Sequence, residues 1–208
     1  MARELRSADE RRQDHEPSRQ QRSHKNRVLA GLRADERAWI AGAQTGSLPD
    51  LEALFREHWP RAHRAAYLVV HDGAAAEEIA QEAMLSAIRT LDRFDRRRPF
   101  GPWLHRVVVN RAIDWARARE LRAVAGEPAL ELAARGRSED ASPTQPVLAA
   151  LGELSPEHRA VIVLRHLLEY SPREIAGMLG LPRGTVNSRL RRGLNALADR
   201  LEVGEDTL

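Results

Sequence analysis

The sequence contains no cysteine among its 208 residues. This absence excludes disulfides, a thiolate nucleophile and any zinc site built on cysteine, and it suits a reducing cytoplasm. No stretch approaches the roughly 18 consecutive apolar residues that a membrane-spanning helix needs. The N-terminal segment also lacks the apolar core of a secretory signal. We therefore expect a soluble, cytoplasmic protein that does not insert into membranes.

Aromatic residues are also scarce, at 4% of the chain against 42% hydrophobic residues. This composition permits small helical cores and argues against a large, aromatic-rich sandwich or barrel. Lysine occurs once, at Lys25, so arginine supplies nearly all of the positive charge in a chain of formal net charge +3. Arginine suits phosphates and guanine edges, but arginine bias also follows from genome composition. Composition alone leaves both explanations open.

The usual signatures of an active site or a metal site are missing as well. The sequence has no glycine-rich phosphate loop and no His-Glu-x-x-His pair. His58 and His63 are five residues apart, which is the wrong spacing for two metal ligands on one helix face. We therefore expect no enzyme activity, no metal and no cofactor.

Apolar residues at three- and four-residue steps predict helices throughout the N-terminal half. We expect a short helix over 35–44 and longer ones over about 50–71, 74–91 and 99–122. Pro60 falls inside the second helix, where it predicts a kink or a break. No alternating strand pattern of convincing length is present, so the predicted fold class is all-α.

Composition divides the chain into four segments. Residues 1–34 offer almost nothing to bury and predict a disordered basic tail. Residues 35–122 predict one small helical domain, and residues 123–146, rich in Gly, Pro and Ser, predict a flexible linker. Residues 147–203 predict a second helical domain. In it, Ser171-Pro172-x-Glu174 is a capping box, and two helices joined through Gly180 have a helix-turn-helix layout.

The helix expected after Pro182 has no acid in its first ten residues. Arginine, asparagine and hydroxyl groups at the start of a helix suit base edges and phosphates in a major groove. The alternative is a solvated basic surface, but the turn, the caps and the missing acids together favour DNA contact. The candidate DNA-binding side chains are Arg183, Thr185, Asn187, Ser188, Arg191 and Arg192.

The helix expected over 74–91 has an acidic face. Glu78 and Glu82 are four residues apart, so they form a mildly unfavourable like-charge pair, and Gln81 and Leu85 lie beside them. Such a face could dock a basic partner. The residues alone favour a simpler interpretation, a solvated surface on which Arg89 relieves the repulsion.

Cations and aromatics alternate around the start of the helix expected over 99–122. Proteins hold single-stranded nucleic acid by charge on the backbone and by stacking on bases. Trp103 and Trp115 fall at helical spacing with valines and are assigned to the core, whereas Phe100, nearer the loop, is the better candidate for a base contact. The candidate residues are Arg96, Arg97, Arg98, Phe100, Arg106, Asn110 and Arg111.

Three segments, in order, resemble bacterial RNA polymerase sigma factors of the extracytoplasmic-function (ECF) group of the sigma-70 family. Residues 76–84 (AEEIAQEAM) resemble the part of region two that touches the polymerase clamp. Residues 94–114 are similar to the part that melts and reads the minus-ten promoter element. Residues 170–190 resemble the region-four helix-turn-helix, which reads the minus-thirty-five element. Glu78, Met84 and Asn187 depart from residues common in the family.

The resemblance implies a sigma factor that directs core RNA polymerase to a subset of promoters. It reverses the simpler interpretation of the acidic face, because Glu78, Gln81, Glu82 and Leu85 would dock on the clamp helices. Residues 96–100 would help to hold a flipped base of the melted non-template strand, and Arg106 and Asn110 would face the separating strands. The implied partners are core polymerase, duplex and melted promoter DNA, and an anti-sigma factor as a family expectation.

Two other classes of protein are weighed against this one. A LuxR-type regulator has a similar C-terminal helix-turn-helix and binds duplex operators as a dimer, but it would have no use for the acidic face or the basic loop. A resolvase-like recombinase would need a nucleophilic serine among arginines on an α/β domain. The N-terminal half has no strand pattern to build that domain.

Overall fold

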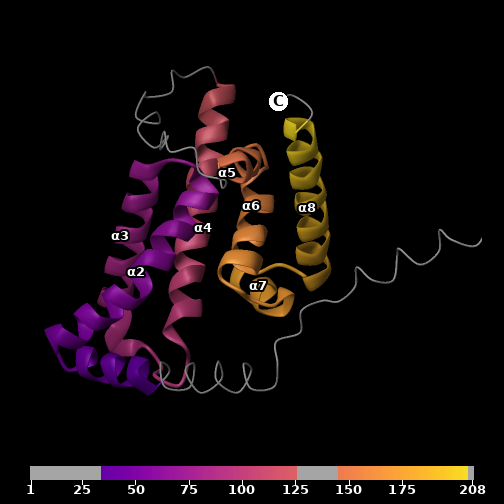
Figure 1. Cartoon of the computed structure of the whole chain (residues 1–208). Coiled ribbons are helices and arrows are strands. Elements are labelled where there is room, and N and C mark those ends of the chain that lie inside the picture. Colours follow the sequence, from indigo (N-terminus) through magenta and orange to yellow (C-terminus); the bar gives the residue numbers. More distant parts are fainter. Residues whose placement is uncertain (1–33, 126–144, 206–208) are drawn as a thin grey trace, which may run out of the picture.

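The structure is a computed structural model that describes residues 34–125 and 145–205. Every regular element in these two ranges is helical, so the predicted all-α class is confirmed there (Figure 1). The predicted tail (1–34) and linker (123–146) lie outside the described residues except at their edges. The last helix before the gap continues to Val124, and the first one after it begins at Gln145.

The N-terminal unit begins with a helix over 34–44. Ser47 then caps the next helix by accepting a hydrogen bond from the Asp50 N–H, and Asp72 caps the third by accepting one from the Ala75 N–H. His71, in the left-handed region at φ 53°, ends the second helix. The elements after the first helix are α2 (Leu48–Val70), α3 (Gly73–Thr90), the short 3-10 helix η2 (Leu91–Arg93) and α4 (Phe100–Val124).

Helix α2 runs through Pro60 without the break that was one of the two predicted outcomes. Proline removes the N–H that would bond to the carbonyl of Arg56, four residues earlier. Both residues are exposed to solvent, so water can satisfy that carbonyl. The buried residues on either side, such as Leu54 and Ala62, keep the helix packed against the core.

The C-terminal unit contains the predicted helix-turn-helix. The capping box at Ser171 is present: its side chain accepts from the Glu174 N–H, and the Glu174 carboxylate accepts from the Ser171 N–H at 2.8 Å. Gly180 ends that helix with a left-handed φ of 65°. The elements are α5 (Gln145–Gly152), α6 (Pro156–Ile162), the π-helical turn η4 (Val163–Leu167), α7 (Pro172–Leu179) and α8 (Arg183–Glu205).

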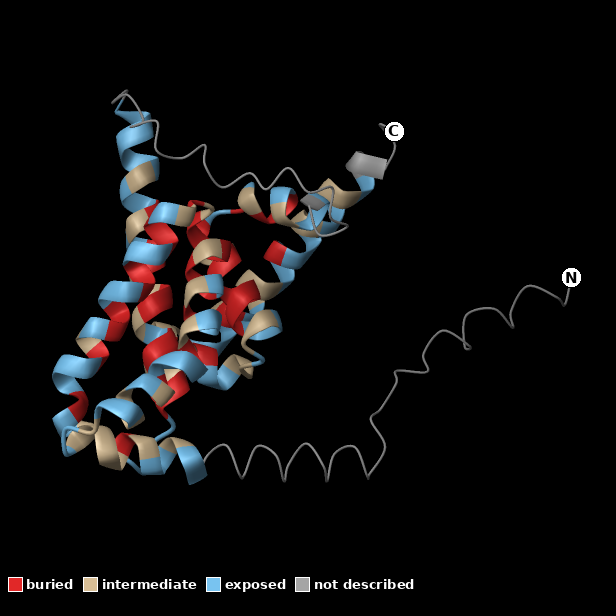
Figure 2. Ribbon diagram, turned by 60° about the vertical axis from the view of Figure 1, so that its left-hand side comes forward, coloured by how far each residue is buried: buried red, intermediate tan, exposed pale blue. Residues whose placement is uncertain are grey.

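Hydrophobic periodicity identified the buried face of α3 correctly. Figure 2 shows the buried faces of the helices turned toward one another. The six apolar positions predicted for the helix over 74–91 are all buried: Ala76, Ile79, Ala80, Ala83, Ala87 and, in η2, Leu91. In α8, Leu194 falls at helical spacing with Val186 and Leu190, which predicts that it faces the core, but it is 38% exposed. Gly193 is buried in its place, because a Cβ there would lie 3.0 Å from Cδ1 of Ile162, where α6 crosses α8.

The two units pack directly on each other, which the sequence did not predict. Helices α5, α6 and α7 lie against α2 and α4, so buried residues of both units form one cluster (Figure 1). At this contact His105 Nδ1 lies 2.7 Å from the Tyr170 hydroxyl, and Arg117 Nε donates to Glu157 at 2.6 Å. The arrangement is therefore a docked pair of helical units.

Acidification is expected to destabilise this docked arrangement. Burial, together with the charges of His58 and Arg61, lowers the pKa of His105 to about 3, although Glu36 acts in the opposite direction. Since the unfolded pKa is about 6.5, the full stability is present above pH 6.5 and is lost progressively as the pH falls toward 3. Between pH 6.5 and 5 the loss is about 2 kcal/mol. The pKa of His71 is lowered to about 4 by burial and by Arg159, so His71 acts in the same direction.

Urea titrations at pH 7 and pH 5 measure this effect. His105→Gln keeps a polar partner for Tyr170 but does not titrate, so it should reduce the dependence on pH. Equal free energies of unfolding for the wild-type protein at both pH values would contradict the assignment of a neutral, buried His105.

Candidate polymerase and nucleic-acid interfaces

The acidic face of α3 is exposed to solvent. Glu78, Gln81 and Glu82 are all exposed, and Leu85 is 50% exposed. Gln81 donates a hydrogen bond to Glu77 at 3.1 Å along the same helix. The buried stripe on the opposite side fixes α3 against α2 and α4. All four predicted docking residues are therefore accessible to a partner.

A contact between helices balances part of this acidic charge. Arg111 of α4 donates to the Glu82 carboxylate of α3. The sequence had assigned that compensation to Arg89. Both partners are partly exposed, so the pair contributes little to stability. The contact does place a predicted polymerase-binding residue, Glu82, directly beside a predicted DNA-binding residue, Arg111.

Asp95 forms hydrogen bonds within the basic segment between η2 and α4. Its carboxylate accepts from the backbone N–H and from Nε of Arg97, each at 3.0 Å. These hydrogen bonds lower the pKa of Asp95 below its ordinary value. Arg96, Arg97 and Arg98 are all exposed. The segment therefore presents three guanidinium groups from one short turn.

Phe100 does not lie at the surface as expected from its place beside the loop. It is only 3% exposed, and its ring lies 5.0 Å from that of His58. It belongs to an aromatic cluster with Phe94 and Trp103, with ring centroids 5.3–5.7 Å apart. This is a correction: in this conformation the ring supports the base of the loop and is not free to stack on a nucleotide. Trp103, which is only half-buried, is the aromatic with more open surface.

Helix α4 continues the basic surface beyond the loop. Trp103, Arg106 and Asn110 follow one another at steps of three and four residues, which places them on one side of the helix. Arg106 is exposed and Asn110 is half-buried, while Leu104 and Val108 face the core. The predicted residues of loop and helix are thus brought to adjoining parts of the N-terminal unit.

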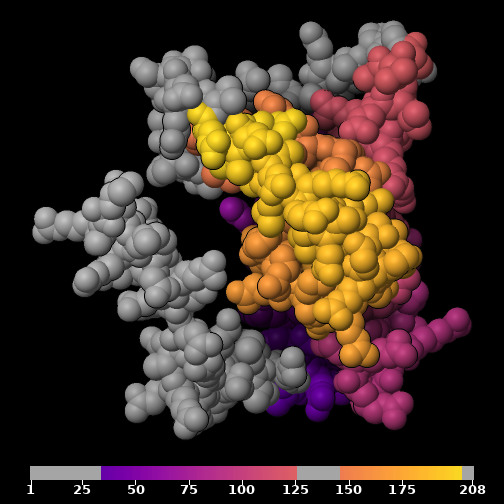
Figure 3. All heavy atoms as spheres, turned by 90° about the vertical axis from the view of Figure 1, so that its right-hand side faces the viewer, coloured from indigo at the N-terminus to yellow at the C-terminus, as the bar shows by residue number. Residues whose placement is uncertain are grey.

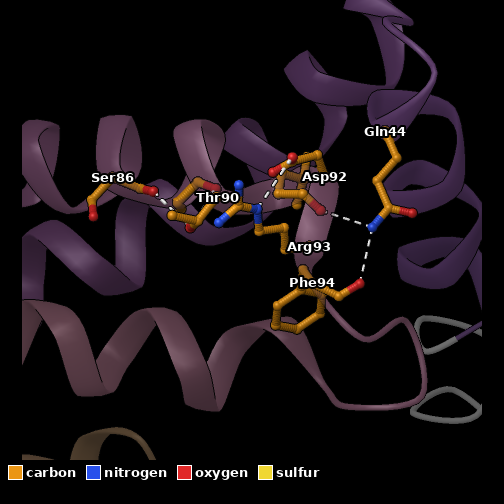
Figure 4. Close-up of polar contacts among 8 residues, drawn as sticks. Gln44, Ser86, Thr90, Asp92, Arg93 and Phe94 are labelled. Atoms are coloured by element: carbon orange, nitrogen blue, oxygen red, sulfur yellow. Dashed lines mark hydrogen bonds and ion pairs between the residues drawn. The ribbon is translucent and has the colours of Figure 1, made fainter.

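Two side chains that sequence reasoning missed hold this loop at its ends. Gln44 Nε2 donates to the carbonyls of Leu91 and Phe94, at 2.8 and 2.9 Å (Figure 4). Glu36 accepts from the backbone N–H of Phe100 at 2.7 Å. The partners lie 47 to 64 residues apart in the sequence. No local pattern could have indicated these contacts.

Helix α8 lies on the outside of the C-terminal unit, as the yellow atoms in Figure 3 show. Arg183, Asn187 and Arg191 are exposed at four-residue steps, and Arg192 is exposed beside them. Val186 is fully buried and anchors the opposite side of the helix. The remaining two predicted residues are only half-exposed, and the hydroxyl of one, Ser188, donates to the carbonyl of the other, Thr185, at 2.9 Å.

Within residues 34–125 and 145–205, none of the helices is long and apolar enough to cross a membrane. No three His, Asp or Glu side chains in these ranges are grouped so that they could hold a metal ion.

Two family models match the chain. One, described as Sigma-70 region 2, matches residues 54–122, and the other, described as Sigma-70, region 4, matches residues 144–197. These matches contain the acidic face, the basic loop and the helix-turn-helix.

The chain is also similar to individual sigma factors. It is 32% identical over 170 residues to the ECF RNA polymerase sigma factor SigE of Mycolicibacterium smegmatis, covering 77% of this chain and 65% of SigE, just under two thirds of SigE's length. It is 32% identical over 159 residues to the RNA polymerase sigma factor CarQ of Myxococcus xanthus, covering 75% of this chain and 91% of CarQ. Among solved structures, CnrH in complex with the cytosolic domain of CnrY is similar at a TM-score of 0.60 and 26% identity, covering 81% of this chain and 98% of the other.

Proposed function

Because the chain belongs to the sigma-70 family of RNA polymerase sigma factors, in its ECF group, we propose a specific division of labour between its two units. Residues 35–122 bind core polymerase and melt the minus-ten element, and residues 147–203 read the minus-thirty-five element. The protein directs core polymerase to promoters, and we propose that it performs no bond chemistry itself. It acts where the polymerase works, in the cytoplasm.

The observation that carries this proposal is the separate exposure of three surfaces on one scaffold. The acidic face of α3 is suited to a basic partner, and Glu78, Gln81, Glu82 and Leu85 would contact the clamp helices of the largest polymerase subunit. This surface is the solvent-exposed side of α3, and the opposite side of α3 is buried in the core. Docking there leaves α8 and the basic loop free, and only Arg111, which donates to Glu82, lies at the border between the two surfaces.

The basic loop and α4 are suited to melted DNA. Arg96, Arg97 and Arg98 would hold the backbone of the non-template strand, and Arg106, Asn110 and Arg111 would face the separating strands. Flipping a base costs a few kcal/mol. Binding to polymerase and contacts between the flipped base and this surface must offset that cost. Phe100 then acts as the packed floor of the loop, because its ring is buried.

On α8, the exposed stripe would enter the major groove of the minus-thirty-five element. Arg183, Asn187 and Arg191 are placed to reach base edges or phosphates, with Arg192 beside them. Thr185 and Ser188, which bond to each other, would contribute at the edge of this surface. The LuxR-type alternative is not favoured, since the match to Sigma-70 region 2 over 54–122 gives the N-terminal unit a role that such a regulator lacks.

An anti-sigma factor is proposed as a third partner. The similar protein CnrH was solved in complex with the cytosolic domain of CnrY. The direct test of the whole proposal is an assay of the purified protein with bacterial core polymerase, followed by run-off transcription on genomic fragments. Tight association and new start sites are expected. Failure to bind core polymerase, with duplex DNA bound by the protein alone, would contradict it.

Replacing Arg191 and Arg192 with alanine tests the role of α8. We expect weaker promoter binding by the assembled holoenzyme and a slope of log affinity against log salt that is shallower by about 1.8, because two phosphate contacts are lost. The matched control is Arg200→Ala, at the other end of the same helix, where Arg200 donates to Glu153 at 2.8 Å. An unchanged affinity and slope would place these two arginines away from the DNA.

A further inference from the structure

The helix over 34–44 lies outside the stretch that matches Sigma-70 region 2, yet it holds both ends of the basic loop. Ile40 is fully buried and fixes this helix in the core of the N-terminal unit. Gln44 and Glu36 are eight residues apart, or about 12 Å along the helix axis. The helix therefore spans the distance between the start and the end of the loop.

At the start of the loop, Gln44 supplies side-chain donors to two backbone carbonyls. One of them, the Leu91 carbonyl, also accepts from the Phe94 N–H at 3.0 Å, the bond that closes the 3-10 helix η2. The amide nitrogen of Gln44 has two hydrogens and donates one to Leu91 and one to Phe94, as the dashed lines in Figure 4 show. Both N–H groups of the Gln44 amide therefore donate to residues on either side of Asp92 and Arg93.

At the end of the loop, Glu36 supplies a cap from a distance. The N-cap of α4 is Pro99, which makes no side-chain capping bond. The first helical N–H, that of Phe100, instead donates to Glu36 at 2.7 Å. A carboxylate at a helix N-terminus also interacts favourably with the helix dipole. The other oxygen of Glu36 lies 3.3 Å from Nε2 of His58 on α2.

We propose that Gln44 and Glu36 are positioning residues for promoter melting. They hold the segment over 94–99 in a conformation in which Arg96, Arg97 and Arg98 are exposed beside the aromatic cluster. The inference rests on the proposed function of that loop in holding the minus-ten element. It adds two residues that touch neither DNA nor polymerase and that act through the loop they hold.

Gln44→Met is the decisive variant, because methionine has nearly the same length and volume but cannot donate to the two carbonyls. With core polymerase bound, we expect open-complex formation at a promoter to slow by about tenfold, while affinity for core polymerase changes by less than about twofold. The readout is the fluorescence of 2-aminopurine placed in the minus-ten element. Thr45→Ala is the matched control, since Thr45 bonds only to Gly42 of its own helix.

A variant cycle separates positioning from a general loss of stability. The triple variant R96A/R97A/R98A removes the side chains that the loop presents. If Gln44 acts through these arginines, Gln44→Met should cause little further slowing in the triple variant. The inference is overturned if Gln44→Met slows melting as much in the triple variant as in the wild type. It is also overturned if Gln44→Met lowers the affinity for core polymerase as much as it slows melting.

The same cycle distinguishes this inference from the proposed function. A triple variant that melts promoters as fast as the wild type would refute the role of the loop itself. A slow triple variant together with a normal Gln44→Met variant would refute only the positioning role. Glu36 gives an independent check: Glu36→Gln keeps an acceptor for the Phe100 N–H and should stay close to wild type, whereas Glu36→Leu should slow melting.

Discussion

Reversing the charge of Glu78 and Glu82 to lysine is expected to abolish binding to core RNA polymerase. Both carboxylates are exposed on α3 and are proposed to face a basic partner. Reversal replaces attraction by repulsion, and like charges set against each other in an interface cost several kcal/mol. Core affinity should therefore fall by at least about 100-fold. A competition assay against a labelled sigma factor measures this loss directly.

The contact between Glu82 and Arg111 requires a separate control. A lysine at position 82 would also repel Arg111, so the double variant disturbs two contacts. Glu78→Lys alone isolates the proposed interface, and Arg111→Ala alone isolates the helix–helix pair. Glu202→Lys, on the exposed far end of α8, controls for the change in net charge. Unchanged core binding by the double variant, with helix content intact by circular dichroism, would refute the interface.

Local signals in the sequence were sufficient for much of the fold. The buried stripe of α3 follows from its period, because a helix buried on one side must place apolar residues at three- and four-residue steps. The capping box at Ser171 could be predicted because all of its contacts lie within three residues. The helix-turn-helix followed from that cap and from Gly180. These features depend on neighbours in the chain and on nothing else.

The parts that could not be predicted depend on distant partners. The bonds from Gln44 join residues 47 and 50 positions apart, and the pairing of Arg111 with Glu82 spans 29. Phe100 was misplaced because a residue in the first turn of a helix has no preceding turn to fix its face. Only the packing of Phe94 and His58 around it decides that it is buried. Gly193 was overlooked for the same reason, since its importance comes from Ile162 on another helix.

Locking the two units together is expected to abolish promoter-specific transcription without preventing core binding. If the units read the minus-ten and minus-thirty-five elements, their contacts lie about 25 base pairs apart, or about 85 Å along B-DNA. A compact body of about 150 residues is only about 40 Å across. The docked arrangement therefore cannot reach both elements, and the contact containing His105 and Tyr170 has to open. The chain between Ala125 and Gln145 allows these two residues to lie up to about 70 Å apart, and the width of the two units adds to that reach.

The absence of cysteine makes an engineered disulfide unambiguous. A Cβ added to Gly152 of α5 would lie 3.6 Å from Cγ of His71 at the end of α2. Cγ is one bond from Cβ, so the two Cβ positions lie no more than about 5.1 Å apart, a span that includes the separation of about 3.8 Å that a disulfide needs. The double variant H71C/G152C should therefore close a bridge between the two units on oxidation.

The oxidised double variant should still bind core polymerase, because the acidic face of α3 is exposed in the docked arrangement. Run-off transcription from a promoter with both elements should fall by at least about tenfold, and a reductant should restore it. The single variants H71C and G152C control for the loss of each native residue. Full transcription by a protein shown to be crosslinked on a non-reducing gel would mean that the units need not separate. The bridge touches no surface proposed to bind polymerase or DNA. Loss of transcription by the crosslinked protein would therefore mean that the units have to separate.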